Sequence, residues 1–110
     1  MAEPAIAFDI TVEDFKKMLD DGVEHQLIDC RRPNEFAFSN IGGTLIEMNS
    51  IPQHLDDFRD DVPLVIVCRT GSRSTMVTEF LRRNGFPNAR NLQGGIYAWN
   101  ERIDPTVKKY

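Results

Sequence analysis

A cysteine followed by two arginines, a glycine and three hydroxyl residues stands at residues 68–74, in the stretch CRTGSRS. Arginine matches the oxygens of planar and tetrahedral anions, because its guanidinium presents several N–H groups in a fixed fork. A glycine lets the backbone turn sharply, with a positive φ where the turn requires one. The stretch therefore predicts a small loop that binds an anion around the sulfur of Cys68.

The elements expected on either side of this loop would hold the cysteine at its floor. Residues 64–68 (LVIVC) are apolar throughout, as in a strand that is buried on both faces. Residues 72–83 are predicted to form a helix, because four apolar residues share one face: Met76, Val77, Phe80 and Leu81. The N-terminus of this helix would lie behind the loop and direct backbone N–H groups at a bound anion.

The same surroundings would change the chemistry of the Cys68 thiol. Helix N-termini and nearby arginines favour the thiolate and can lower a cysteine pKa from about 8.5 to roughly 3.5–7.5. Most cysteines at strand ends are small buried hydrophobic residues, but a structural cysteine does not need two guanidinium groups beside it. We therefore predict that Cys68 is a nucleophile open to solvent-borne substrates. The predicted substrate-binding residues are those of the loop: Arg69, Thr70, Gly71, Ser72, Arg73 and Ser74.

The rest of the chain predicts an α/β fold. Further strands are expected at residues 6–10, 25–30, 44–48 and 90–92. Further helices are expected at 32–38, at 51–58, after Gly94-Gly95, and before Gly22, where Val12, Phe15, Met18 and Leu19 share a face. Because strands and helices alternate, we expect a central, mainly parallel sheet of about five strands with helices on both faces. Ligands of such sheets bind outside the carboxyl ends of the strands, where Cys68 would lie.

The composition narrows the possible partners and locations. The 110 residues are expected to form one domain, 1–110, and the net charge of −4 argues against nucleic acid as the main partner. No apolar run approaches the ~20 residues of a membrane span, and the N-terminus does not resemble a secretory signal. Two cysteines do not make a disulfide scaffold, so we expect a reducing cytoplasm. No histidine joins a cysteine at a metal-ligand spacing, so we expect no metal, and nothing indicates a cofactor.

Two enzyme chemistries fit a thiolate inside an anion-binding loop. One is that of cysteine phosphatases and arsenate reductases, and the other is transfer of sulfane sulfur through a cysteine persulfide. Cysteine phosphatases use a C-x5-R loop, whereas four residues separate Cys68 from Arg73. The shorter loop favours the outer sulfur of a persulfide over a phosphoryl group.

Three segments, in order along the chain, resemble the motifs of single-domain rhodaneses, which are sulfurtransferases. The loop CRTGSRS at 68–74 is similar to the family's C-R-x-G-x-R-S. The segment IDCRRPNEF at 28–36 is similar to I-D-V-R-x-x-x-E-F, and NLQGGIYAW at 91–99 is similar to N-L-x-G-G-x-x-A-W. The resemblance covers nearly the whole chain and implies the rhodanese-like form of the α/β fold.

The resemblance also implies a mechanism. A small donor such as thiosulfate, or the persulfide of another protein, would pass sulfur to Cys68, which would hand it to a thiol, cyanide or a protein acceptor. Asp29, Arg31 and Glu35 would brace the site from the neighbouring strand end; a purely structural salt-bridge cluster is the equal alternative. The alternative function is that of a rhodanese-fold module that binds partners without turnover, although such modules usually lack the cysteine.

Departures from the family pattern occur at two places. The segment NIGGT at 40–44 replaces the frequent H-I-P-G-A, which affects a turn. Cys30 stands where the family mostly has valine. It could resolve a Cys68 persulfide or oxidise with Cys68, but a buried replacement for valine is the favoured interpretation.

The tail from Gly94 to Tyr110 is similar to the rhodanese domains that end adenylyltransferase–sulfurtransferase proteins. That similarity implies a ubiquitin-like sulfur carrier as a possible acceptor. A free-standing enzyme and one domain of a longer chain both remain open.

Overall fold

A five-stranded parallel sheet lies at the centre of the structure, a computed structural model that describes residues 6–110. The order across the sheet is β1-β5-β4-β2-β3, and every neighbouring pair is parallel. The strands are β1 (Asp9–Ile10), β2 (Gln26–Asp29), β3 (Thr44–Leu45), β4 (Leu64–Val67) and β5 (Ala89–Leu92). The predicted α/β fold with a central parallel sheet is confirmed.

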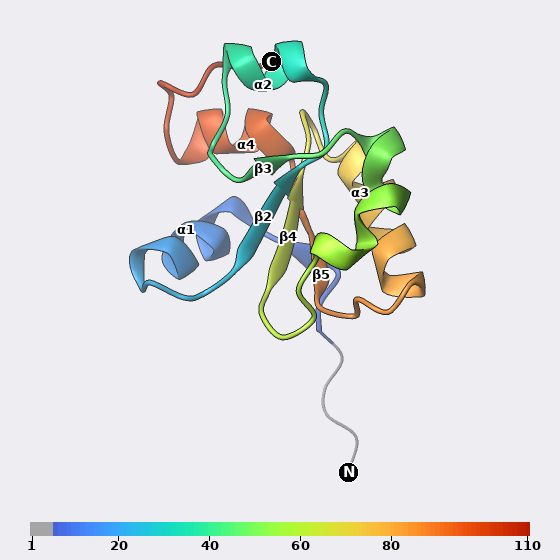
Figure 1. Cartoon of the computed structure of the whole chain (residues 1–110). Coiled ribbons are helices and arrows are strands. Elements are labelled where there is room, and N and C mark those ends of the chain that lie inside the picture. Colours follow the sequence, from blue (N-terminus) through green and yellow to red (C-terminus); the bar gives the residue numbers. More distant parts are fainter. Residues whose placement is uncertain (1–5) are drawn as a thin grey trace.

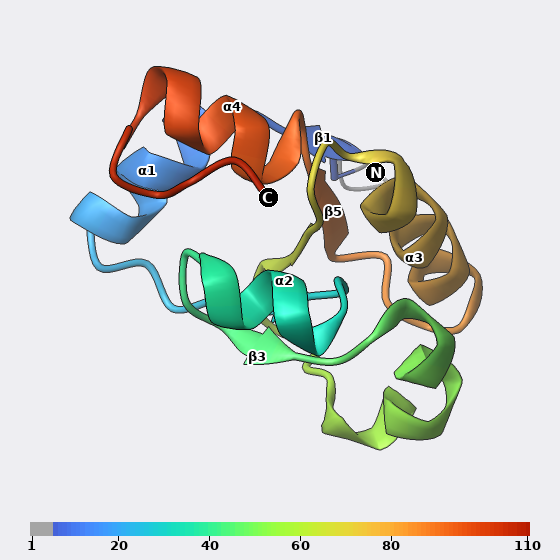
Figure 2. The same ribbon diagram turned by 90° about the horizontal axis from the view of Figure 1, so that it is seen from above.

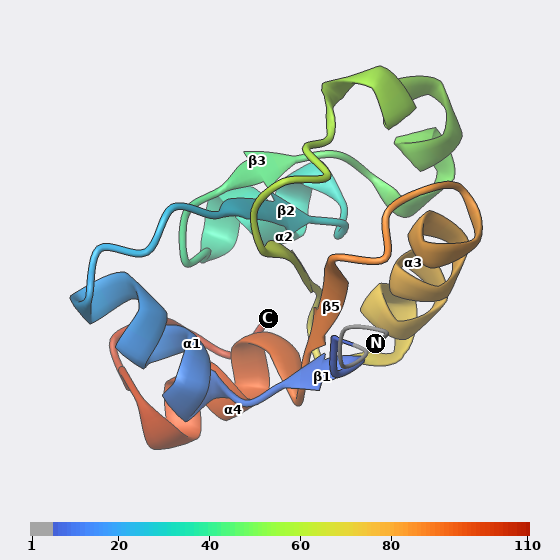
Figure 3. The same cartoon turned by 90° about the horizontal axis from the view of Figure 1, so that it is seen from below.

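Helices cover both faces of the sheet (Figure 1). α1 (Val12–Asp20) and α4 (Gly95–Arg102) pack on one face, and α3 (Ser72–Arg83) packs on the other beside the 3₁₀-helical segment η1 (Met48–Asp57). Figure 3 shows these two layers from the opposite end. The short helix α2 (Pro33–Phe38) lies above the carboxyl ends of the strands, close to the C-terminal segment (Figure 2).

Strand β4 is buried on both faces, as its continuous apolar sequence predicts. Leu64, Ile66 and the following Cys68 belong to the core under α3 and η1, whereas Val65 and Val67 belong to the core under α1 and α4. Alternation along the strand therefore turns the Cys68 side chain toward the α3 face at the carboxyl end of the sheet.

Helix α3 buries most of the face that we predicted, but not all of it. Val77 and Leu81 are buried together with Ser74 and Thr78, and Phe80 is partly buried, whereas Met76 is 53% exposed. The two hydroxyl residues can be buried because each side chain is hydrogen-bonded: Thr78 donates to the Ser74 carbonyl, and Ser74 donates to Oδ1 of Asn91, with the Gly71 carbonyl 3.2 Å away. This orientation brings Ser74, rather than an apolar residue, next to Cys68.

Other predicted elements differ in length or type. The strands expected at 6–10 and 44–48 are each reduced to two residues, β1 and β3. The helix expected at 51–58 is η1, which begins at Met48 and contains Pro52, a residue with no N–H to donate. Leu19 of α1 is exposed rather than buried. Within residues 6–110, none of the helices is long and apolar enough to cross a membrane.

Candidate active site

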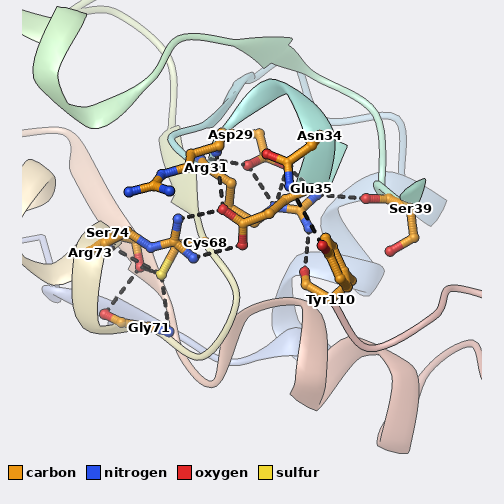
Figure 4. Close-up of polar contacts among 11 residues, drawn as sticks. Asp29, Arg31, Asn34, Glu35, Ser39, Cys68, Gly71, Arg73, Ser74 and Tyr110 are labelled. Carbon is orange, nitrogen blue, oxygen red and sulfur yellow. Dashed lines mark hydrogen bonds and ion pairs between the residues drawn. The ribbon is translucent and has the colours of Figure 1, made fainter. Parts of the chain in front are cut away.

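Cys68 follows the last residue of β4, and several hydrogen-bonding groups converge on its sulfur (Figure 4). The backbone N–H groups of Gly71 and Ser74 donate to Sγ at 3.1 and 3.3 Å, and the Ser74 hydroxyl lies 3.3 Å from it. Gly71 precedes α3 with a φ of 109°, a conformation that favours glycine. We predicted that the backbone N–H groups of this loop bind a substrate anion. In the structure, two of them donate to the cysteine sulfur itself.

The start of α4 holds the other side of the loop. The backbone N–H groups of Ile96 and Tyr97 donate to the carbonyls of Cys68 and Arg69 at 3.0 and 3.1 Å. Because C=O and N–H point in opposite directions across a trans peptide, these bonds turn the first N–H groups of the loop away from α4. The close approach requires glycine at position 95, where φ is 57° and a Cβ would lie 2.3 Å from the Cys68 carbonyl oxygen.

Asn91 also supports the sulfur, and nothing in the sequence singled it out as a site residue. Its Oδ1 accepts from the Ser74 hydroxyl at 2.5 Å, and its Nδ2 donates to Asp9 Oδ1 at 2.9 Å. These contacts link β5 and β1 to the loop. An asparagine within a short strand gives no signal of its own, because the contact exists only where β5 lies beside β4.

Hydrogen bonds favour the thiolate form of Cys68. A hydrogen bond from the Cys30 thiol is the largest cause that lowers the pKa of Cys68 to about 5; the Ser74 hydroxyl and the Ser74 and Gly71 amides add to it, and burial opposes them. The same contact with Cys68 raises the pKa of Cys30, and burial raises it further. The low pKa therefore has a different main cause from the arginines that the sequence indicated.

Arg73 is paired with a carboxylate in this structure. Its Nη1 and Nη2 donate to the two carboxylate oxygens of Glu35 at 2.7 and 2.9 Å. Glu35 also accepts from the backbone N–H of Arg32 at 3.1 Å, at the start of α2. The Arg73 contact is the main cause that lowers the pKa of Glu35 to about 2. The pair occupies one N–H of each Nη, so Arg73 keeps further N–H groups that could bind a substrate anion in the cavity that it lines.

Asp29 and Arg31 form a fully buried pair at the end of β2. Arg31 Nε and Nη2 donate to the Asp29 carboxylate at 2.9 and 2.8 Å. The same guanidinium donates to the carbonyls of Ser39 and Tyr110 at 2.6 and 2.5 Å. These contacts join β2, α2 and the C-terminal segment, and in the described part of the chain neither side chain is hydrogen-bonded to the 68–74 loop. Glu35 is the predicted supporting residue that does contact the loop, through Arg73.

A cavity of about 590 Å³ opens at the carboxyl ends of the strands. Its lining is mostly polar and charged and consists of Cys30, Arg31, Arg32, Asn34, Glu35, Glu47, Met48, Asn49, Arg69, Arg73 and Tyr110.

The predicted accessibility of Cys68 is wrong for this structure. Cys68 is 0% exposed and does not line the cavity. Its sulfur is turned inward, toward hydrogen-bond partners in the loop, Gly71 and Ser74, that are themselves buried. Of the other predicted binding residues, Arg69 and Arg73 line the cavity, whereas Thr70 and Ser72 are exposed outside that lining.

Comparison of the chain with known proteins identifies its family. The family model described as "Rhodanese-like domain" matches residues 11–102. The chain is 32% identical to the maize protein "Adenylyltransferase and sulfurtransferase MOCS3-2" over 92% of its own length and 23% of that protein. It is 32% identical to "Probable adenylyltransferase/sulfurtransferase MoeZ" of Mycobacterium tuberculosis over 99% of its length and 29% of that protein.

A solved structure gives the same result. The "Rhodanese-like Domain Protein from Staphylococcus aureus" is 32% identical and superposes with a TM-score of 0.80, over 94% of this chain and 99% of that one. The chain spans less than a third of each of the two adenylyltransferase–sulfurtransferases but nearly all of the staphylococcal domain. The chain therefore belongs to the rhodanese-like domain family, as its three motifs predicted.

Proposed function

We propose that the protein is a sulfurtransferase that carries a sulfane sulfur on Cys68. The observation that carries the proposal is the convergence of the Gly71 and Ser74 N–H groups and the Ser74 hydroxyl on one sulfur, whose pKa is lowered to about 5. A cysteine with such a pKa is a thiolate, and hence nucleophilic, at neutral pH. The names of two relatives include sulfurtransferase activity, which supports the same reaction class.

The reaction would proceed in two displacements. The Cys68 thiolate attacks the outer sulfur of thiosulfate, and sulfite leaves with the electron pair of the broken S–S bond. A thiolate or cyanide then attacks the outer sulfur of the resulting persulfide, and the Cys68 thiolate leaves. The loop donors stabilise negative charge on this sulfur at the start and the end of the cycle.

The cavity supports substrates larger than thiosulfate. Its volume of about 590 Å³ lies in the range of sites for sizeable ligands, and Arg69 gives it a cation at the rim. A small donor such as thiosulfate, the persulfide of another protein, and a ubiquitin-like sulfur carrier are the partners that we propose. A donor in this cavity meets Cys30, Arg69 and Arg73 before Cys68, so at least one of these side chains must move.

We also propose the reducing cytoplasm as the location, where both cysteines would stay free, as they are here.

A second function is favoured by one observation. Cys68 is 0% exposed while the charged cavity beside it is open. A rhodanese-fold module that binds a partner without turnover would need the cavity and not the sulfur.

Formation of thiocyanate from thiosulfate and cyanide distinguishes the two functions. The wild type is expected to form thiocyanate, and Cys68→Ala is expected to lose this activity while it melts at a similar temperature. Equal rates in the two proteins would reject Cys68 as the nucleophile. No thiocyanate from either protein would favour the binding module. Hydrolysis of a phosphate ester at a rate similar to that of thiocyanate formation would instead support a cysteine phosphatase.

A further inference from the structure

Cys30 and Cys68 occupy paired positions at the ends of neighbouring parallel strands. Asp29 of β2 is in register with Val67 of β4, and the Cys30 N–H donates to the Val67 carbonyl at 3.0 Å, so the ladder continues to the two cysteines. Both side chains belong to the core on the α3 face. Neighbouring strands lie about 4.8 Å apart, within the roughly 4.4–6.8 Å between Cα atoms that a disulfide requires.

The two cysteines differ in their surroundings. Cys30 lines the cavity, and Cys68 does not. The loop donors Gly71 and Ser74 belong to the start of α3, whereas Cys30 follows β2. Cys68 and burial raise the pKa of Cys30, whereas the pKa of Cys68 is lowered to about 5, so at neutral pH Cys30 is the thiol and Cys68 the thiolate. A valine at position 30 would fill a similar space but could neither donate a proton nor form a bond to sulfur.

We propose that Cys30 is the resolving cysteine of this site, whose sulfur displaces the outer sulfur of a Cys68 persulfide as hydrosulfide and leaves a Cys30–Cys68 disulfide. This inference rests on the proposed function, because it needs the persulfide as its starting point. It adds a sulfide-releasing reaction that requires no acceptor from solution.

Atoms and electrons balance in this step. A bond forms between the two Sγ atoms, and the bond between Cys68 Sγ and the outer sulfur breaks. The Cys30 proton passes to the outer sulfur, and the resulting Cys30 thiolate attacks Cys68 Sγ. The outer sulfur leaves as HS⁻ with the electron pair of the broken bond, so the persulfide anion and the thiol become the disulfide and HS⁻. Cys30 is oxidised and the outer sulfur is reduced, and no other oxidant takes part. A dithiol in solution would then reduce the disulfide and restore both cysteines.

Position 30 offers a matched pair of variants. Cys30→Ser keeps a hydroxyl donor beside Cys68 but cannot form a disulfide, and Cys30→Ala removes both properties with little change in packing volume. The full-length chain and both variants are reduced, freed of reductant, and treated with thiosulfate without oxygen. Their intact masses are measured without reduction, and released sulfide is quantified.

We expect the wild type to lose two hydrogens, with Cys30 joined to Cys68 in the peptide map and one sulfide released per disulfide. Both variants should gain one sulfur on Cys68 and release no sulfide. A wild type that keeps its persulfide as the variants do would overturn the resolving role and leave the proposed function intact.

The remaining outcomes are also decisive. If Cys68 gains no sulfur in any of the three proteins, the proposed function fails, and the resolving step fails with it. A disulfide that forms equally without thiosulfate would show oxidation by another agent and would contradict the inference. Sulfide release by a Cys30 variant at the wild-type rate would also contradict it.

Discussion

Glu35 of α2 and Arg73 of α3 form a forked ion pair that joins two helices packed around the candidate active site, with N···O distances of 2.7 and 2.9 Å. The pair is mostly buried, so breaking it leaves a charge without a partner. Both residues line the cavity. The pair therefore contributes to stability and lies at the wall of the candidate active site.

The stability given by this pair should depend on pH. The pKa of Glu35 is lowered from 4.5 to about 2, so the contribution is complete above pH 4.5 and is lost as the pH falls through about 2. At pH 7, Glu35→Gln should reduce the free energy of unfolding by roughly 2 kcal/mol, the value of a hydrogen bond to a charged group. Urea unfolding of both proteins at several pH values measures the difference. A difference that does not shrink between pH 4.5 and 2 would contradict this account.

Replacement of Cys30 should raise the pKa of Cys68, because it removes the largest cause of the lowered value. Loss of a hydrogen bond to a charged group costs roughly 1.5–3 kcal/mol, which corresponds to about one to two pKa units. Cys30→Val should therefore move the ultraviolet absorbance of the Cys68 thiolate, and the onset of sulfur transfer from thiosulfate, to higher pH.

Cys30→Ser serves as the control for this effect, since its hydroxyl can still donate to Cys68. Its titration should fall between those of the wild type and Cys30→Val. Arg73→Ala should shift the titration less than Cys30→Val, because the charge of Arg73 is already balanced by Glu35. A larger rise of the Cys68 pKa in Arg73→Ala than in Cys30→Val would show that Arg73 is the main cause of the lowered pKa.

Ser74→Ala should destabilise the protein by about 1–3 kcal/mol. The substitution leaves Oδ1 of the buried Asn91 without the hydroxyl that donates to it. It also removes one of the groups that lower the pKa of Cys68. Ser72→Ala is the matched control on the same helix turn, because Ser72 is exposed, and its effect should stay within about 0.5 kcal/mol. Equal melting temperatures for the two variants would contradict the role of Ser74.

Gly95→Ala should disturb the loop more than a glycine substitution that affects φ alone. Gly85 is the comparison: its φ is 96°, and an added Cβ would have nothing within 4 Å. Gly85→Ala should cost about 1–2 kcal/mol from strained backbone. Gly95→Ala adds a Cβ at 2.3 Å from the Cys68 carbonyl oxygen and should cost about 2 kcal/mol more.

The Gly95→Ala substitution should also weaken the hydrogen bonds to the Cys68 sulfur. A Cβ there pushes the Cys68 carbonyl away from the N-terminus of α4, so the loop amides lose their orientation. Sulfur transfer from thiosulfate should fall in folded Gly95→Ala but not in Gly85→Ala. Equal activity in the two variants would show that the contact with α4 does not position the loop.

Structural features that depend only on nearby residues could be predicted from the sequence. The apolar run of β4, the positive φ of Gly71 and the glycine pair before α4 follow from residue type and spacing, and the structure has all three. The inward position of the Cys68 sulfur could not be read in the same way. It depends on Ser74 replacing Met76 on the buried face of α3, and hydroxyl residues join such a face only when a nearby carbonyl accepts from them.

Contacts between segments that are far apart in the sequence could not be predicted either. Asn91 contacts Ser74 because β5 is the neighbour of β4. The sequence of a single strand does not determine which strand lies beside it. The Arg31 guanidinium reaches the Tyr110 carbonyl across 79 positions of the chain. The proximity of Cys30 to Cys68 needed the register of β2 with β4, which two short apolar strands do not specify.

The covered position of Cys68 has a consequence for how this cysteine would be found in a cell extract. Labelling surveys rank thiols by their reaction with bulky, neutral electrophiles, and such reagents are stopped at the side chains that line the cavity. Cys68 would be scored as inert despite its thiolate character, so a low labelling rank of this cysteine would reflect its burial and not its pKa.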